Sequence, residues 1–189
     1  MSFKISIASL KIKNLLKGGN SKMLTPVFLT KEIAEKAVHY IEDIIHDMDN
    51  VLPRMMCYIV VLVPSMKDDR DRDYPDWPNY QIKPYALYEY NLGDPASWPH
   101  DFASIAKCKA LQLWHGRNDD RTDCIPHLLF PGDTPFWGGV KRHGIVVTCS
   151  GFQPYFDKMF SGMIADMCIG LAYNAWIKTK DGLNGDFLP

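Results

Sequence analysis

Apolar side chains recur at helical spacing in residues 31–50. They fall on one arc at about 100° per residue, and the charged side chains of the segment fall on the opposite side. Thr30 precedes the segment in the position of a helix N-cap. The pattern therefore predicts an amphipathic helix that covers a sheet. Its apolar arc consists of Ile33, Ala34, Ala37, Val38, Ile41, Ile44, Ile45 and Met48.

The next segments alternate between apolar runs and polar stretches. Met55–Val63 is rich in β-branched residues and predicts a buried strand that ends at Pro64. Residues 65–79 carry many charges of both signs and predict a solvated loop. The aromatic segment 80–90 predicts a second strand, which Pro84 interrupts.

The second half of the chain also alternates helices and strands. Residues 101–115 predict a helix, Val140 and residues 145–149 predict two short strands joined by a turn, and residues 154–178 predict a long amphipathic helix. Pairs of strands close in sequence and flanked by helices favour an antiparallel sheet over a doubly wound parallel one. The expected fold class is α/β of the α+β type, with an antiparallel sheet flanked by helices.

Composition narrows the class of protein. The chain has 189 residues, of which 47% are hydrophobic, and its net charge of −1 does not favour nucleic acid as a partner. No apolar run reaches the roughly 20 residues needed to span a bilayer. The five cysteines are scattered and odd in number, which favours reduced thiols in a cytoplasmic protein over a disulfide framework.

The two ends differ from the middle. Residues 1–23 hold five lysines and no acidic residue, so we expect a basic arm that is either disordered or a mitochondrial targeting segment. The folded domain is expected over residues 24–180, with a C-terminal tail over 181–189.

Two motifs carry the most specific spacing in the chain. Ala106-x-x-Lys109-Ala110 lies in the second predicted helix. The other reads Phe130-Pro131-Gly132, Pro135, Gly139-Val140, a turn at Gly144, an apolar strand, Ser150-Gly151, and Asp157 at the start of the last helix. Together they resemble the HbpS/GlcG family, which includes the C-terminal domain of PduO-type proteins. The chain departs from the family pattern at Asp133, where a second glycine is usual, at Gln112, where a threonine is common, and at residues 64–79, which replace an Asp-x-Gly-Gly turn.

The resemblance implies several properties. It implies a single-domain, profilin-like, three-layer arrangement and a homo-oligomer. It also implies haem or another tetrapyrrole as the bound small molecule, with a role in sensing, storage or protection.

Histidines and arginines supply candidate haem contacts. His39 and His46 share the polar face of the first helix, but about 10.5 Å along its axis separates them, so only one could ligate a given iron within one protomer. His115, Arg117 and Arg121 could bind a propionate. His143 lies at the predicted hairpin tip. Solvated histidines and cations at a helix C-terminus explain the same residues without a ligand.

An enzyme on the same scaffold is the alternative. Aromatic residues near the predicted strand ends could line a pocket for a small hydrophobic molecule, between residues 80–90 and Phe136–Trp137. Lys109, Asp133 and His143 are the candidate acid–base groups. Lys109 is either a buried functional amine or a surface lysine whose stem covers apolar surface.

Overall fold

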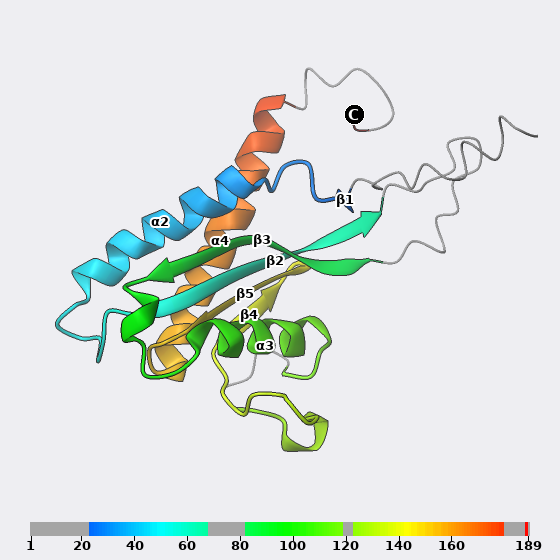
Figure 1. Cartoon of the computed structure of the whole chain (residues 1–189). Coiled ribbons are helices and arrows are strands. Elements are labelled where there is room, and N and C mark those ends of the chain that lie inside the picture. The colour runs from blue at the N-terminus through cyan, green and yellow to red at the C-terminus, as the bar shows by residue number, and fades with distance from the viewer. Residues whose placement is uncertain (1–22, 68–81, 119–122, 180–187, 189) are drawn as a thin grey trace, which may run out of the picture. The chain divides into compact units, whose positions relative to one another are not determined.

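The computed structural model describes residues 23–67, 82–118, 123–179 and 188 (Figure 1). Of the basic segment 1–23, the structure describes Met23 alone, and nearly all of the expected tail lies outside the described residues. Most of the charged segment 65–79 and the candidate Arg121 also lie outside them.

The chain divides into two compact units. The smaller comprises residues 1–24 and 66–81, and its described part is strand β1 (Met23–Leu24) paired antiparallel with Met66–Lys67, the last residues of β2. The larger comprises residues 25–65 and 82–189 and contains every site discussed below.

Antiparallel strands form the centre of the larger unit. They are β2 (Cys57–Lys67), β3 (Lys83–Leu92), β4 (Gly139–Arg142) and β5 (Ile145–Ser150). β2 pairs with both β3 and β5, and β5 pairs with β4, so the order across the sheet is β3-β2-β5-β4. With β1, the described residues contain five strands, and the expected antiparallel sheet is confirmed.

Helices cover both faces of this sheet. α2 (Lys31–Asp47) and α4 (Pro154–Thr179) pack against each other and share one apolar core with the sheet, whereas α3 (Phe102–Trp114) packs in a second core. In Figure 1, α3 lies on the side of the strands opposite to α2 and α4. The mixed α/β class with flanking helices is therefore confirmed.

The central strand contributes to both cores. Ile59 and Val61 pack in the core of α2 and α4, while the intervening Val60 packs in the core of α3. Because successive side chains of a strand point to opposite faces, a strand covered on both sides needs an uninterrupted apolar run. This explains why Met55–Val63 is apolar throughout.

The prolines do not end the strands, contrary to the sequence prediction. Pro64 lies within β2 and pairs in register with Pro84 of β3. The pairing of β2 with β5 ends at Leu62, and β3 is an edge strand, so each proline lies where one edge of its strand lacks a neighbour. A missing N–H at such a position removes no ladder hydrogen bond.

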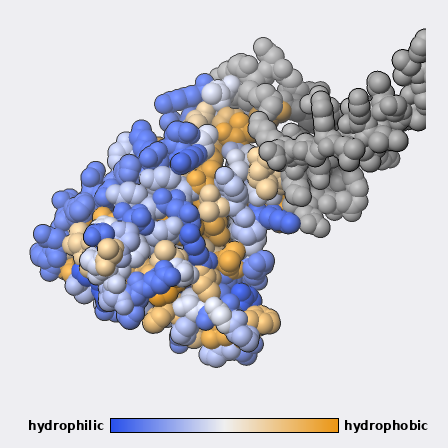
Figure 2. All heavy atoms as spheres, in the orientation of Figure 1, coloured by the Kyte–Doolittle hydropathy of each residue, from blue (hydrophilic) through white to orange (hydrophobic). Residues whose placement is uncertain are grey.

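α2 begins at its expected cap, Thr30, whereas Asp101, expected as the first residue of the second helix, is the N-cap of α3. Thr30 accepts a hydrogen bond from the Ile33 N–H at 3.4 Å, and Asp101 accepts one from the Ser104 N–H at 3.0 Å. The first helix ends at Asp47 instead of residue 50, and Ile44, placed on the apolar arc, is 36% exposed. Hydrophilic side chains cover much of the surface over α2 in Figure 2. Among the described residues, none of the helices combines the length and hydropathy required to cross a membrane.

Candidate functional site at the carboxyl end of β5

A buried ion pair connects the helices of the two faces. The Lys109 ammonium of α3 lies 2.9 Å from Oδ2 of Asp157 in the first turns of α4, and both side chains are at most 3% exposed. Lys109 Nζ also donates to the backbone carbonyl of Cys149 in β5 at 3.1 Å. Lys109 is thus a buried amine, and the surface alternative for it is wrong.

Asp157 is held by several groups. Its Oδ1 accepts a hydrogen bond from the Phe152 N–H at 3.1 Å, while Lys109 occupies Oδ2. Burial raises the pKa of Asp157 to about 6, against the opposing effects of Lys109, the Phe152 N–H and Arg54. A strongly perturbed carboxyl with a specific charge partner is typical of functional sites, although structural ion pairs also produce one.

Two glycines make the close packing around this pair possible. A Cβ on Gly138 would lie 2.6 Å from the Cβ of Asp157. Gly151 has φ +145°, and a Cβ there would lie 2.2 Å from the Met56 carbonyl oxygen. Both positions exclude a side chain because backbone from other segments approaches them.

A pocket of about 260 Å³ opens beside the ion pair; we call it the α3–α4 pocket. Apolar walls come from Phe102 and Ile105 of α3, from Phe136 in the loop before β4, and from Phe152. Phe136 is 52% exposed and forms an outer wall. The complete lining is Arg54, His100, Phe102, Ile105, Lys109, Phe136, Ser150, Gly151, Phe152, Gln153 and Pro154.

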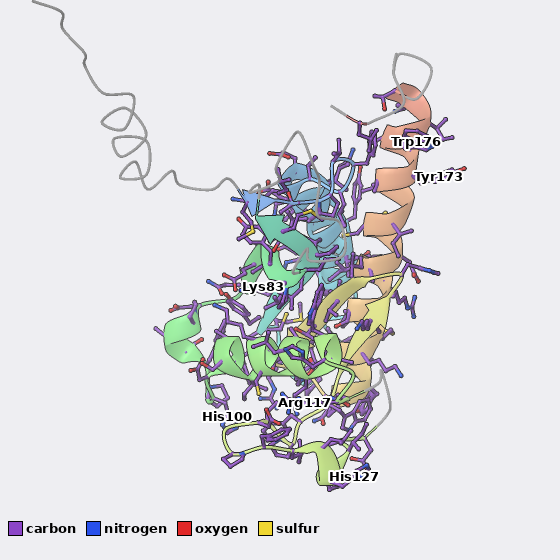
Figure 3. The ribbon with its side chains drawn as sticks, turned by 90° about the vertical axis from the view of Figure 1, so that its right-hand side faces the viewer. Lys83, His100, Arg117, His127, Tyr173 and Trp176 are labelled. Atoms are coloured by element: carbon purple, nitrogen blue, oxygen red, sulfur yellow. The ribbon has the colours of Figure 1, made fainter. Side chains whose placement is uncertain are left out.

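The ionisable lining of the α3–α4 pocket consists of basic side chains. Arg54, Lys109 and His100 line it, and no aspartate or glutamate of the described residues does. The Arg54 guanidinium lies over the Phe102 ring, 5.9 Å from its centroid, and the His100 ring lies 6.1 Å from the same ring. Figure 3 shows His100 near one end of α3 and Arg117 near the other.

The ammonium of Lys109 retains one donor. A lysine ammonium has three N–H bonds, and the contacts to Asp157 and to Cys149 use two of them. Among the described residues no contact uses the third, and Lys109 lines the pocket although it is only 1% exposed.

The candidate histidines do not converge. His39 is exposed on α2 and packs edge-on against Tyr90, with 5.4 Å between ring centroids, whereas His46 is exposed and lies 3.8 Å from Glu42. His115 follows the last residue of α3 and is exposed, as is His143 in the β4–β5 turn, where its φ is +46°.

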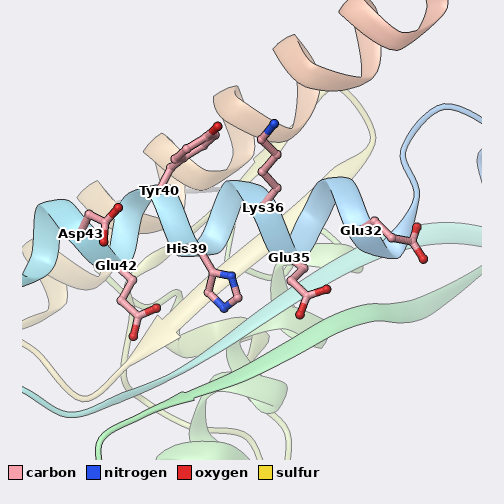
Figure 4. Close-up of a pocket in the computed structure, with 7 residues that line it drawn as sticks. All are labelled: Glu32, Glu35, Lys36, His39, Tyr40, Glu42 and Asp43. Atoms are coloured by element: carbon pink, nitrogen blue, oxygen red, sulfur yellow. The ribbon is translucent and has the colours of Figure 1, made fainter.

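A wide, open pocket of about 660 Å³ lies along α2 beside His39, and we call it the α2 surface. Figure 4 shows Glu35, His39 and Glu42 pointing to one side of the helix, with Lys36 and Tyr40 on the other side. Its ionic lining is mainly acidic and comprises Glu32, Glu35, Lys36, Glu42 and Asp43.

The expected propionate site is occupied by a residue of the chain itself. Arg117 binds both carboxylate oxygens of Asp133, at 3.2 Å for the second contact, and donates to the Leu128 carbonyl at 3.3 Å. The Arg117 guanidinium and the Phe130 N–H hold the pKa of Asp133 below its usual value. The pair therefore holds the loop that leads to Phe136. Because each group is bound to the other, Arg117 is not open to a propionate and Asp133 is not open to act as an acid–base group.

Residues 80–90 do not contribute to the α3–α4 pocket in the part that the structure describes. Tyr88 and Tyr90 instead belong to the core under α2, and Tyr90 donates a hydrogen bond to Glu42. Of the two segments expected to line an enzyme pocket, the Phe136 loop alone does so.

Sequence reasoning missed three residues of the site. Asp157 was noted only as the start of a helix, and neither Arg54 nor His100 was singled out. A signal existed for the ion pair, because Lys109 falls on the buried stripe of α3 with Phe102, Ala106 and Leu113. A lysine in such a stripe needs a buried partner. No comparable pattern marks Arg54.

No group of three or more histidine, cysteine or carboxylate side chains lies close enough to bind a metal among the described residues. Comparisons with protein families, curated proteins and solved structures gave no significant match. The function is therefore argued from the geometry of the site.

Proposed function

We propose that this chain binds a small organic molecule with a flat, apolar body in the α3–α4 pocket. The observation that supports this most strongly is the buried Lys109 ammonium, which lines an otherwise aromatic pocket and retains an unused donor. A concave apolar site with a few convergent polar groups is the usual form of a small-molecule site.

The dimensions favour a small ligand. The pocket volume of about 260 Å³ lies just below the roughly 300–1,000 Å³ of sites that hold drug-sized molecules. A single aromatic ring with one polar substituent suits this space, because Phe102, Phe136 and Phe152 offer ring faces and edges for it to pack against.

The Lys109–Asp157 pair supports a functional role over a purely structural one. A buried ion pair adds little stability compared with an apolar pair of similar volume. Asp157, with its raised pKa near 6, also lies one hydrogen bond behind the ammonium that faces the ligand. This arrangement suits transfer of a proton between ligand and protein, and it supports the proposal that the pocket performs acid–base chemistry on the bound molecule.

The binding proposal is tested with two probes of the same shape, benzoate and benzamide. In the ¹⁵N-labelled full chain, we expect chemical-shift changes at the amides of Ile105, Gly151 and Gln153 with at least one of them. Phe136→Ala removes an exposed wall and should weaken binding, while Tyr155→Ala, at an equally exposed aromatic outside the pocket, should not. Absence of shifts with both probes at millimolar concentration contradicts the proposal.

Haem binding is the second candidate, and the position of His39 favours it. This imidazole is exposed beside an open surface large enough to accept a planar macrocycle, and Tyr90 orients its ring. Four carboxylates and one lysine line that surface, which opposes binding of propionates and ranks this candidate second. Haemin titration tests it: His39→Ala should abolish a Soret band that His46→Ala retains, and an unchanged haemin spectrum with the unmutated protein contradicts it.

We also propose a homo-oligomer. Exposed apolar side chains on α4 support it, namely Tyr155, Met159, Tyr173 and Ile177. Figure 3 shows Tyr173 projecting from this helix. Size-exclusion chromatography with light scattering should give a mass above that of one chain, and a strict monomer contradicts the proposal.

A further inference from the structure

We infer that the ligand of the α3–α4 pocket is a small carboxylic acid, bound as its anion by Arg54 and by the free N–H of Lys109. The inference rests on the proposed function, because it names the chemical class of the molecule that the pocket takes. Three features carry it: the pairing of Arg54, the charge of the lining, and the shape of the apolar walls.

Arg54 is a half-buried cation that has no partner carboxylate in the part of the chain that the structure describes. It forms no ion pair with any residue that the structure describes, and its guanidinium packs over the Phe102 ring. By contrast, Arg117 binds Asp133 and Lys107 binds Glu89 at 2.9 Å. A guanidinium that lines a pocket, and that no internal carboxylate neutralises, is suited to bind an external one through two parallel hydrogen bonds.

The charge balance of the pocket leaves room for one negative group. Asp157 offsets Lys109 within the ion pair, so Arg54 remains as an uncompensated positive charge. Arg54 lies within electrostatic range of this pair, because it lowers the pKa of Asp157. A single carboxylate would therefore satisfy both the guanidinium and the remaining donor of Lys109 without adding excess charge.

The walls favour an acid with an apolar body over inorganic phosphate. Phe102, Ile105 and Phe136 supply apolar surface that a bare oxyanion cannot use. A phosphate would also bring more negative charge than the lone guanidinium offsets.

Isothermal titration of the full chain with benzoate, benzamide and inorganic phosphate tests this inference. Benzamide has the shape of benzoate but no charge. We expect benzoate to bind roughly tenfold more tightly than benzamide, because a carboxylate brings a negative charge and two acceptor oxygens to the guanidinium, whereas the neutral amide brings one acceptor. Arg54→Gln should remove this preference, because benzoate loses its ionic partner, and it should weaken benzamide binding much less. Lys107→Gln, which removes a cation from the exposed side of the same helix region, should leave the preference intact.

The outcomes separate the two proposals. Equal affinities for benzoate and benzamide, or a preference that survives in Arg54→Gln, overturn the carboxylate inference while small-molecule binding stands. Inorganic phosphate that binds as tightly as benzoate overturns it as well, because the apolar body then contributes nothing. Absence of binding by both aromatic probes overturns the proposed function itself.

Discussion

The ammonium of Lys109 lies 2.9 Å from the Asp157 carboxylate although the two residues belong to helices on opposite faces of the sheet. They meet at the carboxyl end of β5, where Lys109 donates to the Cys149 carbonyl and Asp157 accepts from the Phe152 N–H just past the strand. One interaction therefore joins both outer layers and also lines the α3–α4 pocket. The stability of the fold and the chemistry of the site consequently depend on the same two side chains.

Removing one partner of this pair should be costly. Lys109→Met keeps an unbranched apolar stem but leaves the buried Asp157 without its cation, so we expect the free energy of unfolding to fall by about 3–5 kcal/mol. Urea denaturation measures it. Lys107→Met is the matched control, because Lys107 is 50% exposed and its pair with Glu89 is worth at most about 1 kcal/mol.

The double variant Lys109→Met/Asp157→Asn should recover part of this loss. The double variant leaves no buried charge without a partner. The losses in free energy of unfolding of the two single variants should therefore sum to about 1–3 kcal/mol more than the loss of the double variant. Additive effects would mean that the two residues act independently, contrary to the geometry.

The protonation of Asp157 should appear in the pH dependence of stability. Its pKa rises from the ordinary value of 3.8 to about 6 on folding, so the folded state binds more protons than the unfolded state between these pH values. The free energy of unfolding of the unmutated protein, relative to Asp157→Asn, should therefore fall as pH rises through this window. Since one pKa unit corresponds to about 1.4 kcal/mol, the fall should be roughly 3 kcal/mol.

The comparison with Asp157→Asn isolates this carboxyl. Hydrogen bonds lower the pKa values of Glu32, Asp101 and Asp133. These groups make stability rise with pH, but they do so in both proteins and cancel in the difference. Denaturation at several pH values between 3 and 7 provides the difference. A relative stability that rises with pH would contradict the raised pKa of Asp157.

Two glycine-to-alanine changes should have opposite effects. Gly151→Ala places a Cβ 2.2 Å from the Met56 carbonyl oxygen at φ +145°, and we expect it to lower the free energy of unfolding by about 3 kcal/mol or more. A Cβ on Gly170 of α4 meets nothing within 4 Å, so Gly170→Ala should raise the free energy of unfolding by about 0.5–1 kcal/mol. Thermal denaturation distinguishes them, and a tolerated Gly151→Ala would contradict the close approach.

The loop that holds Phe136 should depend on Asp133. This carboxylate accepts a hydrogen bond from the Phe130 N–H at 2.8 Å and pairs with Arg117. Asp133→Asn should speed hydrogen exchange at the Phe130 amide by roughly tenfold, because the charge-assisted bonds are lost. Asp123→Asn is the control, since Asp123 is exposed and, among the described residues, its carboxylate accepts a hydrogen bond from the neighbouring Cys124 N–H alone. Equal exchange in both variants would contradict this role of Asp133.

The fold was largely accessible from local patterns. Helical spacing predicted the three α-helices of the described residues to within a few residues, and the cap Thr30 marked the start of the first because it acts through its neighbours in sequence. The prediction that Pro64 ends a strand was wrong. A proline destabilises a strand only where its missing N–H would have paired with a neighbouring strand, and this depends on which edges of the strand are paired. Sequence alone does not contain that information.

The site was less accessible because its residues lie far apart in sequence. Lys109 and Asp157 are 48 positions apart, and Arg54 comes from the segment before β2. The candidate Arg117 was suited to an anion, but the anion is the chain's own Asp133. Residue type indicated the chemistry in both cases, and only the tertiary arrangement determines which cation is left for a ligand.

The most direct test of ligand binding in the α3–α4 pocket is a set of intermolecular nuclear Overhauser effects between the ring protons of benzoate and the full chain. The pocket predicts contacts to the methyl groups of Ile105 and to the ring of Phe136, and weaker contacts in Arg54→Gln at the same benzoate concentration. Contacts to Tyr40 on the α2 surface instead, or none to Ile105 and Phe136 at saturating benzoate, would contradict it.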